Sequence, residues 1–374
     1  MNAPANSTQP LLTVVGARPQ FIKSASLTRA LDEAGWSQWL VHTGQHPDDG
    51  MGKDFLTELG VADPDARLHP AQSSRSARLA DMLGGIAQEI ERVQPAAVIV
   101  YGDTDSTLAG ALAAHHAGVP LAHIEAGLRS GDRSMPEEHN RIMTDQLSDM
   151  LFTTGAGASA QLRLEGVPEE NIIEVGDVML DVALAAHSIC RERIPPEWPS
   201  SEGPVLVMTL HRPGNVDHPE LLSGALDAAG QWAKETGGVV YFPVHPRTQK
   251  AMLRCGLTLP EGALNPGPLG YLDMQAALLR ATVVLTDSGG VQKEAWFQGA
   301  PAVILRDTTE WKELIEVGAS RLFEPVKLKS GSGRDALVKG LVEAPAVPPI
   351  AGSGLFGEGK AAQRVLQALE QRCC

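Results

Sequence analysis

Short apolar runs alternate with stretches of helical periodicity along almost the whole chain. Segments such as 76–93 and 106–118 repeat their apolar residues at the spacing of one helix face. Between such segments, nearly continuous runs of Val, Ile and Leu predict strands that are buried on both faces. We therefore expect α/β domains built on parallel sheets with helices on both sides. The predicted strands lie at 11–16, 39–44, 97–103, 121–126, 151–155, 172–177, 205–211, 239–245, 282–290 and 301–307.

One stretch, residues 191–204, breaks this alternation. It is rich in Pro and Ser and has little periodicity, which is typical of a linker between domains. The chain has 374 residues, enough for about two domains. Two open parallel sheets in tandem are expected to bind a ligand at the carboxyl ends of their strands, in the cleft between the domains. The predicted organisation is a disordered tail at 1–10, an N-terminal Rossmann-like domain at 11–185, a C-terminal Rossmann-like domain at 186–358 and a terminal helix at 359–374.

Composition narrows the class of protein. Apolar residues make up 43% of the chain and charged residues 20%, which fits a soluble protein with real cores. The formal net charge of −14 argues against a general nucleic-acid binder, because such a protein needs a basic face. No window approaches the ~18 apolar residues of a membrane span, and the N-terminus lacks the pattern of a signal peptide.

The cysteines show neither metal-ligand spacing nor the density of a disulfide framework; they are Cys190, Cys255, Cys373 and Cys374. This pattern favours a reduced, cytoplasmic chain without a metal. A lipidation site at the terminal Cys373–Cys374 pair is the alternative.

Charged and imidazole side chains stand at the ends of the predicted strands instead of being scattered along the chain. Ordinary turns at these places more often carry Gly, Asn and Pro. A ligand site in a parallel sheet requires this placement of polar groups. The residues at strand ends include Arg18, Asp103, Glu125, His211, His245, Asp287, Arg306 and Asp307.

The segment "GARPQFIK" (16–23) predicts a strand, a glycine turn and a helix that begins near Pro19. The amide groups of a helix start favour an anion, and Arg18 and Lys23 would add two positive charges. An ordinary turn with surface charges is an equally good interpretation of this stretch alone. The spacing of the glycines matches neither the dinucleotide fingerprint nor the P-loop.

The segment "TDSGGVQKEA" (286–295) is a better signal for a bound phosphate. Ser288, Gly289 and Gly290 allow the backbone to approach a phosphate closely at a helix start. Glu294 follows one helical turn later and could accept hydrogen bonds from ribose hydroxyls. The alternative is an Asp or Ser N-cap followed by glycines that serve packing. The combination predicts a nucleoside diphosphate, bound without a magnesium motif.

The stretch 123–141 carries a dense set of charges out of a hydrophobic strand into a Gly-rich turn. Glu125 lies in the strand, and Glu137 stands in the first turn of the next helix, where an acidic residue also complements the helix dipole. Arg141 stands at i+4 to Glu137 and could pair with it. Asp103 is either a helix cap or a third member of an acidic site, and His211 precedes a Pro-Gly turn where a ligand group is expected.

These motifs together resemble the non-hydrolysing UDP-N-acetylglucosamine 2-epimerases. They occur in the order of that family and cover most of residues 11–320. The matching motifs are "GARPQFIK", "TGQH" (43–46), "YGDTDSTLAGALAA", "HIEAGLRS", "MPEEHNR", "HR" (211–212), "VHP" (244–246), "LTDSGGVQKEA" and "RDTTEWKE" (306–313).

The resemblance implies a glycosyltransferase-B-type fold of two Rossmann-like domains, with the terminal helix packed back on the first. It implies interconversion of UDP-GlcNAc and UDP-ManNAc for cell-surface polysaccharide precursors, in a homodimer and without a cofactor. The catalytic residues of the family match Asp103, Glu125, Glu137 and His211. Its substrate contacts match Arg18, Lys23, Arg141, His245, Ser288, Gly289, Gly290 and Glu294.

Three departures from the family pattern bear on the substrate and on regulation. The common "GTRPE" is "GARPQ" here, "HRRE" is "HRPG", and Trp311 replaces a frequent arginine. The "GARPQFIK" form is also similar to relatives that epimerise UDP-2,3-diacetamido-2,3-dideoxy-glucuronic acid, which is the second substrate considered. A UDP-sugar-dependent glycosyltransferase, a hydrolysing epimerase and an inactive nucleotide-sugar-binding module are the other functions considered.

Overall fold

The computed structural model describes residues 9–45, 60–71, 74–200, 202–344, 347 and 354–373. The predicted tail, up to residue 8, His46 of the "TGQH" motif and Cys374 of the terminal pair lie outside these ranges. The chain divides into two compact units. The N-terminal unit comprises Met1–Val182 and Leu355–Cys374, and the C-terminal unit comprises Ala183–Gly354.

The N-terminal unit contains a parallel seven-stranded sheet with the strand order β3-β2-β1-β4-β5-β6-β7. Its strands are β1 (Leu11–Val15), β2 (Gln38–His42), β3 (Ala66–Arg67), β4 (Ala97–Tyr101), β5 (Leu121–Ala126), β6 (Met150–Thr153) and β7 (Ile172–Glu174). Its helices are α1 (Arg18–Glu33), α3 (Arg75–Val93), α4 (Asp105–Ala117), α5 (Pro136–Leu147), α6 (Ala156–Leu164), η1 (Glu169–Asn171), the start of α7 (Val178–Glu192), and α15 (Ala361–Cys373).

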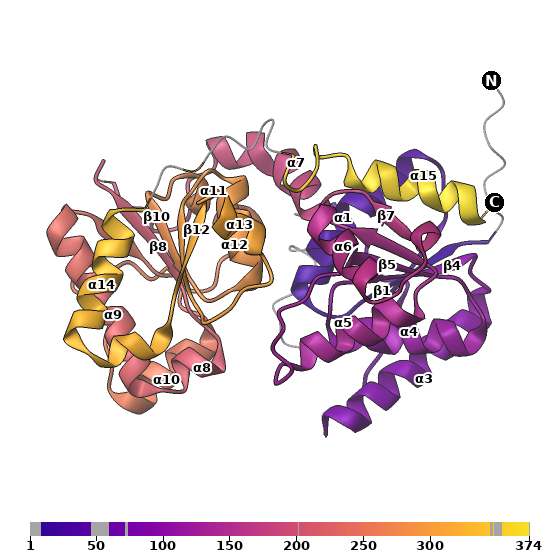
Figure 1. Cartoon of the computed structure of the whole chain (residues 1–374), viewed down its shortest axis with the longest axis horizontal. Helices are drawn as coiled ribbons and strands as arrows, with labels where there is room; N and C mark the ends of the chain where they lie inside the picture. Colours follow the sequence, from indigo (N-terminus) through magenta and orange to yellow (C-terminus); the bar gives the residue numbers. More distant parts are fainter. Residues whose placement is uncertain are drawn as a thin grey trace. The chain divides into compact units, whose positions relative to one another are not determined.

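Helices cover both faces of this sheet (Figure 1). On one face α3 packs on α4 and α4 packs on α5, whereas on the other face α1 packs on α15. Alternate strand residues point to opposite faces, so Leu12 and Val14 of β1 meet Met82 and Ile86 of α3 in one core cluster. Asp181 accepts hydrogen bonds from the first amides of α15 and so fixes the start of that helix.

The C-terminal unit contains a parallel five-stranded sheet with the order β12-β11-β10-β8-β9. Its strands are β8 (Val205–Thr209), β9 (Val239–Tyr241), β10 (Val283–Thr286), β11 (Ala302–Leu305) and β12 (Ser320–Phe323). Its helices are α8 (Pro213–Val216), α9 (Pro219–Thr236), α10 (Pro246–Cys255), α11 (Tyr271–Leu279), α12 (Gly289–Phe297), α13 (Lys312–Glu316), η2 (Pro325–Lys329) and α14 (Gly331–Val342).

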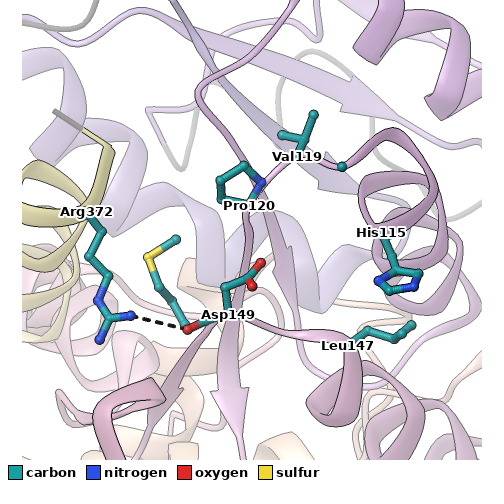
Figure 2. A pocket seen from close by; sticks show the side chains of 8 residues that line it. His115, Val119, Pro120, Leu147, Asp149 and Arg372 are labelled. Carbon is teal, nitrogen blue, oxygen red and sulfur yellow. Dashed lines mark hydrogen bonds between the residues drawn. The ribbon is translucent and has the colours of Figure 1, made fainter.

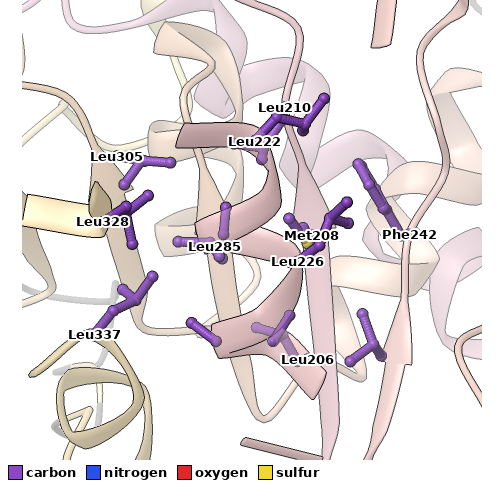
Figure 3. Packing of buried hydrophobic residues seen from close by; sticks show 14 of the residues in the cluster. Leu206, Met208, Leu210, Leu222, Leu226, Phe242, Leu285, Leu305, Leu328 and Leu337 are labelled. Carbon is purple, nitrogen blue, oxygen red and sulfur yellow. The ribbon is translucent and has the colours of Figure 1, made fainter. Parts of the chain in front are cut away.

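The core of this unit follows the same two-residue alternation (Figure 3). Leu206 and Met208 of β8 face the cluster that α9 and α14 cover. Val205 and Val207, one residue out of step, face a second cluster that contains residues of α11 and α12. Both sheet faces are therefore buried, as continuous apolar strands require.

All ten predicted strands are present, although most are shorter than their apolar runs because the last positions belong to turns. Two strands, β3 and β12, were not predicted from the sequence. β3 has only two residues, and β12 pairs with a single neighbour at the edge of its sheet and is half-exposed, so neither shows a continuous apolar pattern. The predicted linker is wrong at its start, because α7 continues to Glu192.

The strand order places a topological switch point in each sheet. In the N-terminal sheet the chain runs outward from β1 in one direction and from β4 in the other. In the C-terminal sheet the corresponding neighbours are β8 and β10. Loops at the carboxyl ends of such strand pairs diverge and leave room for a ligand. A ligand site is therefore expected at the carboxyl ends of these four strands.

No described helix combines the length and the apolar character needed to cross a membrane.

Candidate active site

Two carboxylates and two cations form a compact cluster at the carboxyl ends of β4 and β5. The Lys23 Nζ lies 2.6 Å from Glu125 Oε1, and Arg141 Nη2 lies 2.6 Å from Asp103 Oδ2 and 3.4 Å from Glu125 Oε1. Arg141 also donates to the Glu125 carbonyl oxygen. These residues, Lys23, Asp103, Glu125 and Arg141, are called the carboxylate cluster below. Four of the twelve predicted site residues thus lie together.

The backbone at Glu125 is in the left-handed region, with φ of 69°. The β5–β6 register shifts between Ile124 and Ala126, so Glu125 is the extra residue of a bulge. A non-glycine residue in this conformation costs on the order of 1 kcal/mol or more, and such strain is typical of functional sites. The bulge lets the Glu125 side chain leave the sheet and join the cluster.

Gly102 makes room for this arrangement on the neighbouring strand end. Its φ is 65°, and a Cβ there would lie 3.1 Å from Lys23 Nζ and 3.5 Å from Glu125 Oε1. A side chain would therefore crowd the ion pair and strain the backbone.

Helix α5 presents three charged side chains on one face, at positions Glu137, Arg141 and Asp145. Residues four apart share a helix face. Glu137 is exposed, whereas Arg141 is 5% exposed and Asp145 is 1% exposed. These three side chains therefore extend from the solvent to the interior, and the middle one, Arg141, belongs to the carboxylate cluster. Glu137 lies one turn beyond the cluster on its solvent side.

The turn after β4 is tied to α5 as well. Asn140 Nδ2 donates to the Asp103 carbonyl oxygen at 2.9 Å and to Asp105 Oδ1 at 3.0 Å. Arg75 binds the Asp105 carboxylate through two nitrogens. Although burial disfavours the charged form, the hydrogen bonds from Arg75 and Asn140 lower the pKa of Asp105. This ion pair fixes the helix start that follows Asp103.

The amino end of α1 is used inside the chain, contrary to one sequence-based prediction. The Gly16 and Ala17 amides donate to Gln20 Oε1 at 2.8 and 3.1 Å, so they do not face outward to an anion. Gln20 Nε2 in turn donates to the Tyr101 carbonyl oxygen at 3.0 Å. Gln20 thus joins the ends of β1 and β4, and the half-buried Arg18 at the start of α1 is left as the candidate contact there.

His42, at the end of β2, lies beside this region. Burial, together with the charges of Arg67 and His69, lowers the pKa of His42 to about 4. Its ring packs against Phe21 of α1, with 5.2 Å between the ring centroids. The ring is therefore uncharged at neutral pH.

In the C-terminal unit, the ends of β8 and β10 are joined by one carboxylate. Asp287 accepts hydrogen bonds from the His211 and Arg212 amides and from Asn215 Nδ2. Its Oδ1 also lies 3.3 Å from His211 Nδ1. Asp287 is fully buried, so it can orient the imidazole while the other edge of the ring stays accessible. The carboxyl ends of β8 and β10 form the topological switch point of this sheet, where a ligand is expected to bind.

Two histidines lie side by side at this position, with 5.5 Å between the ring centroids of His211 and His245. Burial lowers the pKa of His211, and the charges of His245, Arg212 and Arg247 lower it further against the opposing effect of Asp287. His245 itself caps α10, because its Nδ1 accepts a hydrogen bond from the Arg247 amide at 3.1 Å. The site therefore favours a neutral His211.

Helix α12 begins at Gly289 with Ser288 as its N-cap, and the Ser288 side chain accepts a hydrogen bond from the Val291 amide. A Cβ on Gly289 would lie 2.3 Å from Glu310 Oε1. Glu310 is paired with Arg306 at 2.8 Å, so a carboxylate held by an arginine lies against the start of α12. The capping interpretation of this segment is correct, and it is compatible with an anion site because only some of the first-turn amides are used.

The other two residues predicted here continue the same helix. Gly290 follows Gly289, and a Cβ on it would lie 3.8 Å from Glu294 Oε1. Glu294 is 8% exposed, one turn into the helix. The predicted phosphate segment and the predicted ribose contact are therefore close to each other.

A cavity of about 490 Å³ lies elsewhere in the N-terminal unit (Figure 2). Its lining includes His115, Pro120, Asp149 and Arg372, and Arg372 donates to the Asp149 carbonyl oxygen at 3.5 Å. Pro120 and Asp149 precede β5 and β6, so the cavity is at the amino ends of these strands. The carboxylate cluster is at their carboxyl ends, and the cavity is therefore not part of the candidate site.

Within the described ranges, His, Cys, Asp and Glu residues form no group of three or more that could hold a metal ion.

Several residues that organise the site were not predicted from the sequence. Asp145, His123 and Asn140 act through hydrogen bonds to segments distant in the chain. The one signal for His123 was a polar residue in the middle of an apolar strand. Asp145 could have been found because it stands four residues after Arg141.

Two parallel-sheet α/β units with polar clusters at their switch points define a glycosyltransferase-B-type protein. The family model for UDP-N-acetylglucosamine 2-epimerases matches residues 29–370. The chain belongs to this family, whose members are named as epimerases, that is, isomerases that act on UDP-sugars.

Relatives match over nearly their full length. The UDP-2,3-diacetamido-2,3-dideoxy-D-glucuronate 2-epimerase of Pseudomonas aeruginosa is 41% identical over 362 residues, which cover 96% of this chain and 99% of the relative. The UDP-N-acetylglucosamine 2-epimerase of Methanocaldococcus jannaschii is 34% identical over 368 residues, covering 96% and 98%.

Solved structures agree with this assignment. The M. jannaschii UDP-GlcNAc 2-epimerase in complex with UDP-GlcNAc and UDP superposes with a TM-score of 0.81 at 32% identity, covering 97% of this chain and 99% of that one. The UDP-GlcNAc 2-epimerase of Neisseria meningitidis bound to UDP-GlcNAc gives 0.85 at 25% identity, with coverage of 97% and 100%.

Proposed function

We propose that the chain is a non-hydrolysing C2 epimerase of a UDP-linked 2-acetamido sugar, which works by eliminating and re-adding UDP. The observation that carries this proposal is the carboxylate cluster. In this cluster one buried arginine, Arg141, holds both Asp103 and Glu125, and the backbone of Glu125 is strained. A purely structural pair would not require a left-handed glutamate at the end of a buried strand.

The chemistry explains why carboxylates are needed. The proton on C2 of an N-acetylhexosamine has no adjacent carbonyl group and is not acidic. A base can remove it when the C2–H electron pair forms a C1=C2 double bond and the C1–O bond breaks, with UDP as the leaving group. The products are UDP and the 1,2-unsaturated sugar, which is 2-acetamidoglucal when the substrate is UDP-GlcNAc. Re-addition of UDP at C1, with a proton delivered to the opposite face of C2, gives the epimer.

Proton removal on one face and delivery on the other require at least two acid–base groups. Asp103 and Glu125 are two carboxylates on one guanidinium, and Glu137 stands one helical turn away on the same face of α5. Lys23 and Arg141 hold the carboxylates in position. We assign the proton transfers to Asp103, Glu125 and Glu137.

The C-terminal unit is assigned to the leaving diphosphate. The α12 start at Ser288, Gly289 and Gly290 offers amide donors and a helix dipole. His211, oriented by Asp287, would donate to the departing phosphate oxygen in its protonated form, which the negative charge of a bound diphosphate favours. Substrate contacts are also assigned to Arg18, to His245 beside His211, and, for the ribose hydroxyls, to Glu294.

Of the two substrates considered, UDP-2,3-diacetamido-2,3-dideoxy-glucuronic acid is the one we propose. The relative named for this substrate is 41% identical to the chain, compared with 34% for the M. jannaschii UDP-GlcNAc enzyme. The "GARPQFIK" motif supports the same choice. UDP-GlcNAc, converted to UDP-ManNAc, is the second candidate because the family model and the solved structures carry that name. Either product would serve as a precursor for cell-surface polysaccharide.

NMR in heavy water tests this function. Each sugar nucleotide is incubated with the enzyme, and the expected result is epimerisation of the preferred substrate with one deuterium at C2 and no acceptor. A glycosyltransferase would need an acceptor and leave C2 unlabelled, and a binding module would do neither. A hydrolysing epimerase would release the free sugar. Any of these three outcomes would overturn the proposal.

We also propose that the enzyme acts as a homodimer, as the resemblance to the family implies, and in the cytoplasm, as the cysteine pattern favours. Sedimentation equilibrium with and without UDP measures the assembly, and a monomer under both conditions would contradict it.

A further inference from the structure

His123 is a buried histidine whose ring hydrogen-bonds to the turn that carries Asp103. The ring lies on β5 and has no exposed surface. Its Nε2 lies 2.7 Å from the Gly102 carbonyl oxygen, and its Nδ1 lies 2.7 Å from Asp145 Oδ1. A carbonyl and a carboxylate both only accept, so the ring donates from both nitrogens. The peptide held by Nε2 is the one that joins Gly102 to Asp103.

Asp145 connects this turn to the segment that follows Glu125. Its second oxygen accepts hydrogen bonds from the Gly127 amide at 3.2 Å and pairs with Arg129 Nη1 at 2.7 Å. Burial disfavours the charged form of Asp145, but the charges of His123, Arg129 and Arg141 outweigh it and lower the pKa of Asp145. Asp145 therefore stays ionised and acts as a common anchor.

Two further contacts make the arrangement specific to the catalytic carboxylates. Asn140 holds the Asp103 carbonyl oxygen, so two successive carbonyl groups of this turn are fixed, one by α5 and one by β5. Gly127 packs closely against α6, since a Cβ on it would lie 2.4 Å from the Ala158 carbonyl oxygen. His123 and Asp145 bind each other and the backbone at Gly102 and Gly127, so their effect on the reaction acts through the backbone.

We propose that His123 and Asp145 are positioning residues, which together fix the relative placement of Asp103 and Glu125. This inference rests on the proposed function and adds to it. A bridging ring of fixed length sets the distance between the β4 turn and the β5 bulge. A shift of about 1 Å in such a constellation costs roughly 10²-fold in rate.

Two substitutions of the same residue separate positioning from plain stability. His123→Gln places an amide donor near the former Nε2 and keeps the hydrogen bond to the Gly102 carbonyl oxygen. His123→Asn places its donor near the former Nδ1 and keeps only the bond to Asp145. Both remove the ring and its charge, so we expect similar losses of thermal stability.

The expected result is a difference in kcat between these variants. His123→Gln should retain kcat within about tenfold of the wild type, whereas His123→Asn should lose on the order of 10²-fold, with KM changed by less than about threefold in both. Equal losses of kcat that follow the loss of stability would indicate a merely structural role and overturn the proposal. So would a His123→Asn enzyme with wild-type kcat.

Asp181→Asn is the matched control. Asp181 is another buried carboxylate of the same unit that accepts backbone amides, from Ala361 and Ala362 at 3.1 and 2.8 Å. Its loss should lower the melting temperature and leave kcat unchanged. A comparable fall in kcat would show that any buried defect in this unit slows the reaction, which would contradict specific positioning by His123.

A second measurement keeps this inference distinct from the proposed function. In ¹H–¹⁵N spectra of the unliganded protein, the His123 ring, identified by its absence in His123→Gln, should show protons on both nitrogens. A ring with one unprotonated nitrogen would overturn the bridge, whatever the substrate. If the wild type labels C2 of neither sugar, the proposed function fails, and this spectrum still decides whether the bridge exists.

Discussion

Replacement of Glu125 by Gln removes a charge at the centre of the carboxylate cluster and preserves its shape. The wild-type side chain is 4% exposed and lies 2.6 Å from Lys23 Nζ. The amide oxygen of Gln can still accept from Lys23, so the side chain should stay in place. The amide cannot accept the C2 proton, however, and it cannot return one.

The expected size of the effect follows from these contacts. Loss of a general acid–base group lowers kcat by about 10²–10⁴-fold. Replacing the carboxylate by an amide in this buried site costs about 2 kcal/mol, because Lys23 and Arg141 lose the opposing charge of Glu125. For a unit of this size, that lowers the melting temperature by roughly 4–8 °C. The folded protein should bind UDP as the wild type does, since UDP is assigned to the C-terminal unit.

Three assays on one preparation separate these effects. Epimerisation is followed by NMR, UDP affinity by calorimetry and stability by thermal unfolding, with Asp181→Asn as the control for loss of a buried carboxylate. A Glu125→Gln enzyme whose kcat is within tenfold of the wild type would refute the assignment of proton transfer to Glu125. Loss of UDP binding would contradict the proposed division of roles, in which the carboxylate cluster transfers protons and the C-terminal unit binds UDP.

Three further changes test individual features of the structure. Gly289→Ala places a Cβ 2.3 Å from Glu310 Oε1 and should weaken UDP binding by at least about tenfold if the α12 start holds the diphosphate; unchanged calorimetry would exclude this site. Gly127→Ala meets the Ala158 carbonyl oxygen at 2.4 Å with φ of 81°, and should lower the free energy of unfolding by more than about 1 kcal/mol in urea titrations; an unchanged midpoint would contradict the contact. The pKa of His42 is lowered to about 4, so the unfolded state binds more protons, and stability is lost as pH falls from about 6.5 toward 4. Between pH 7 and pH 5 this loss should be about 2 kcal/mol, and a His42→Gln variant should show a correspondingly smaller difference between the two pH values; an equal difference would refute the shift.

The sequence contained most of the information on the fold, because parallel strands that are buried on both faces leave long apolar runs. Edge strands do not. β3 comprises Ala66–Arg67, and Ser320–Phe323 of β12 is half-exposed, so both lack that pattern. The predicted start of the linker was also wrong. Helix α7 ends at Glu192, and the prolines that signal its end, Pro195 and Pro196, follow only after two further residues. Side-chain periodicity cannot locate such boundaries to the residue.

The candidate site was predictable where a residue stands at a strand end and less so where it acts through a distant partner. Asp103, Glu125 and His211 belong to the first kind, and the rule for parallel sheets was enough to find them. The His123–Asp145 contact joins residues 22 positions apart, and only the pairing of β5 with its neighbours and the packing of α5 bring them together.

Positional isotope exchange tests the central claim most directly, because it reports breakage of the C1–O bond itself. The substrate carries ¹⁸O in the bridge between C1 and the β-phosphorus, and ³¹P NMR follows the label. Elimination frees UDP, whose β-phosphate can rotate before re-addition, so we expect the label to scramble into non-bridging positions in the wild type and to stay in the bridge in Glu125→Gln. Epimerisation by the wild type with the label held in the bridge would contradict the account.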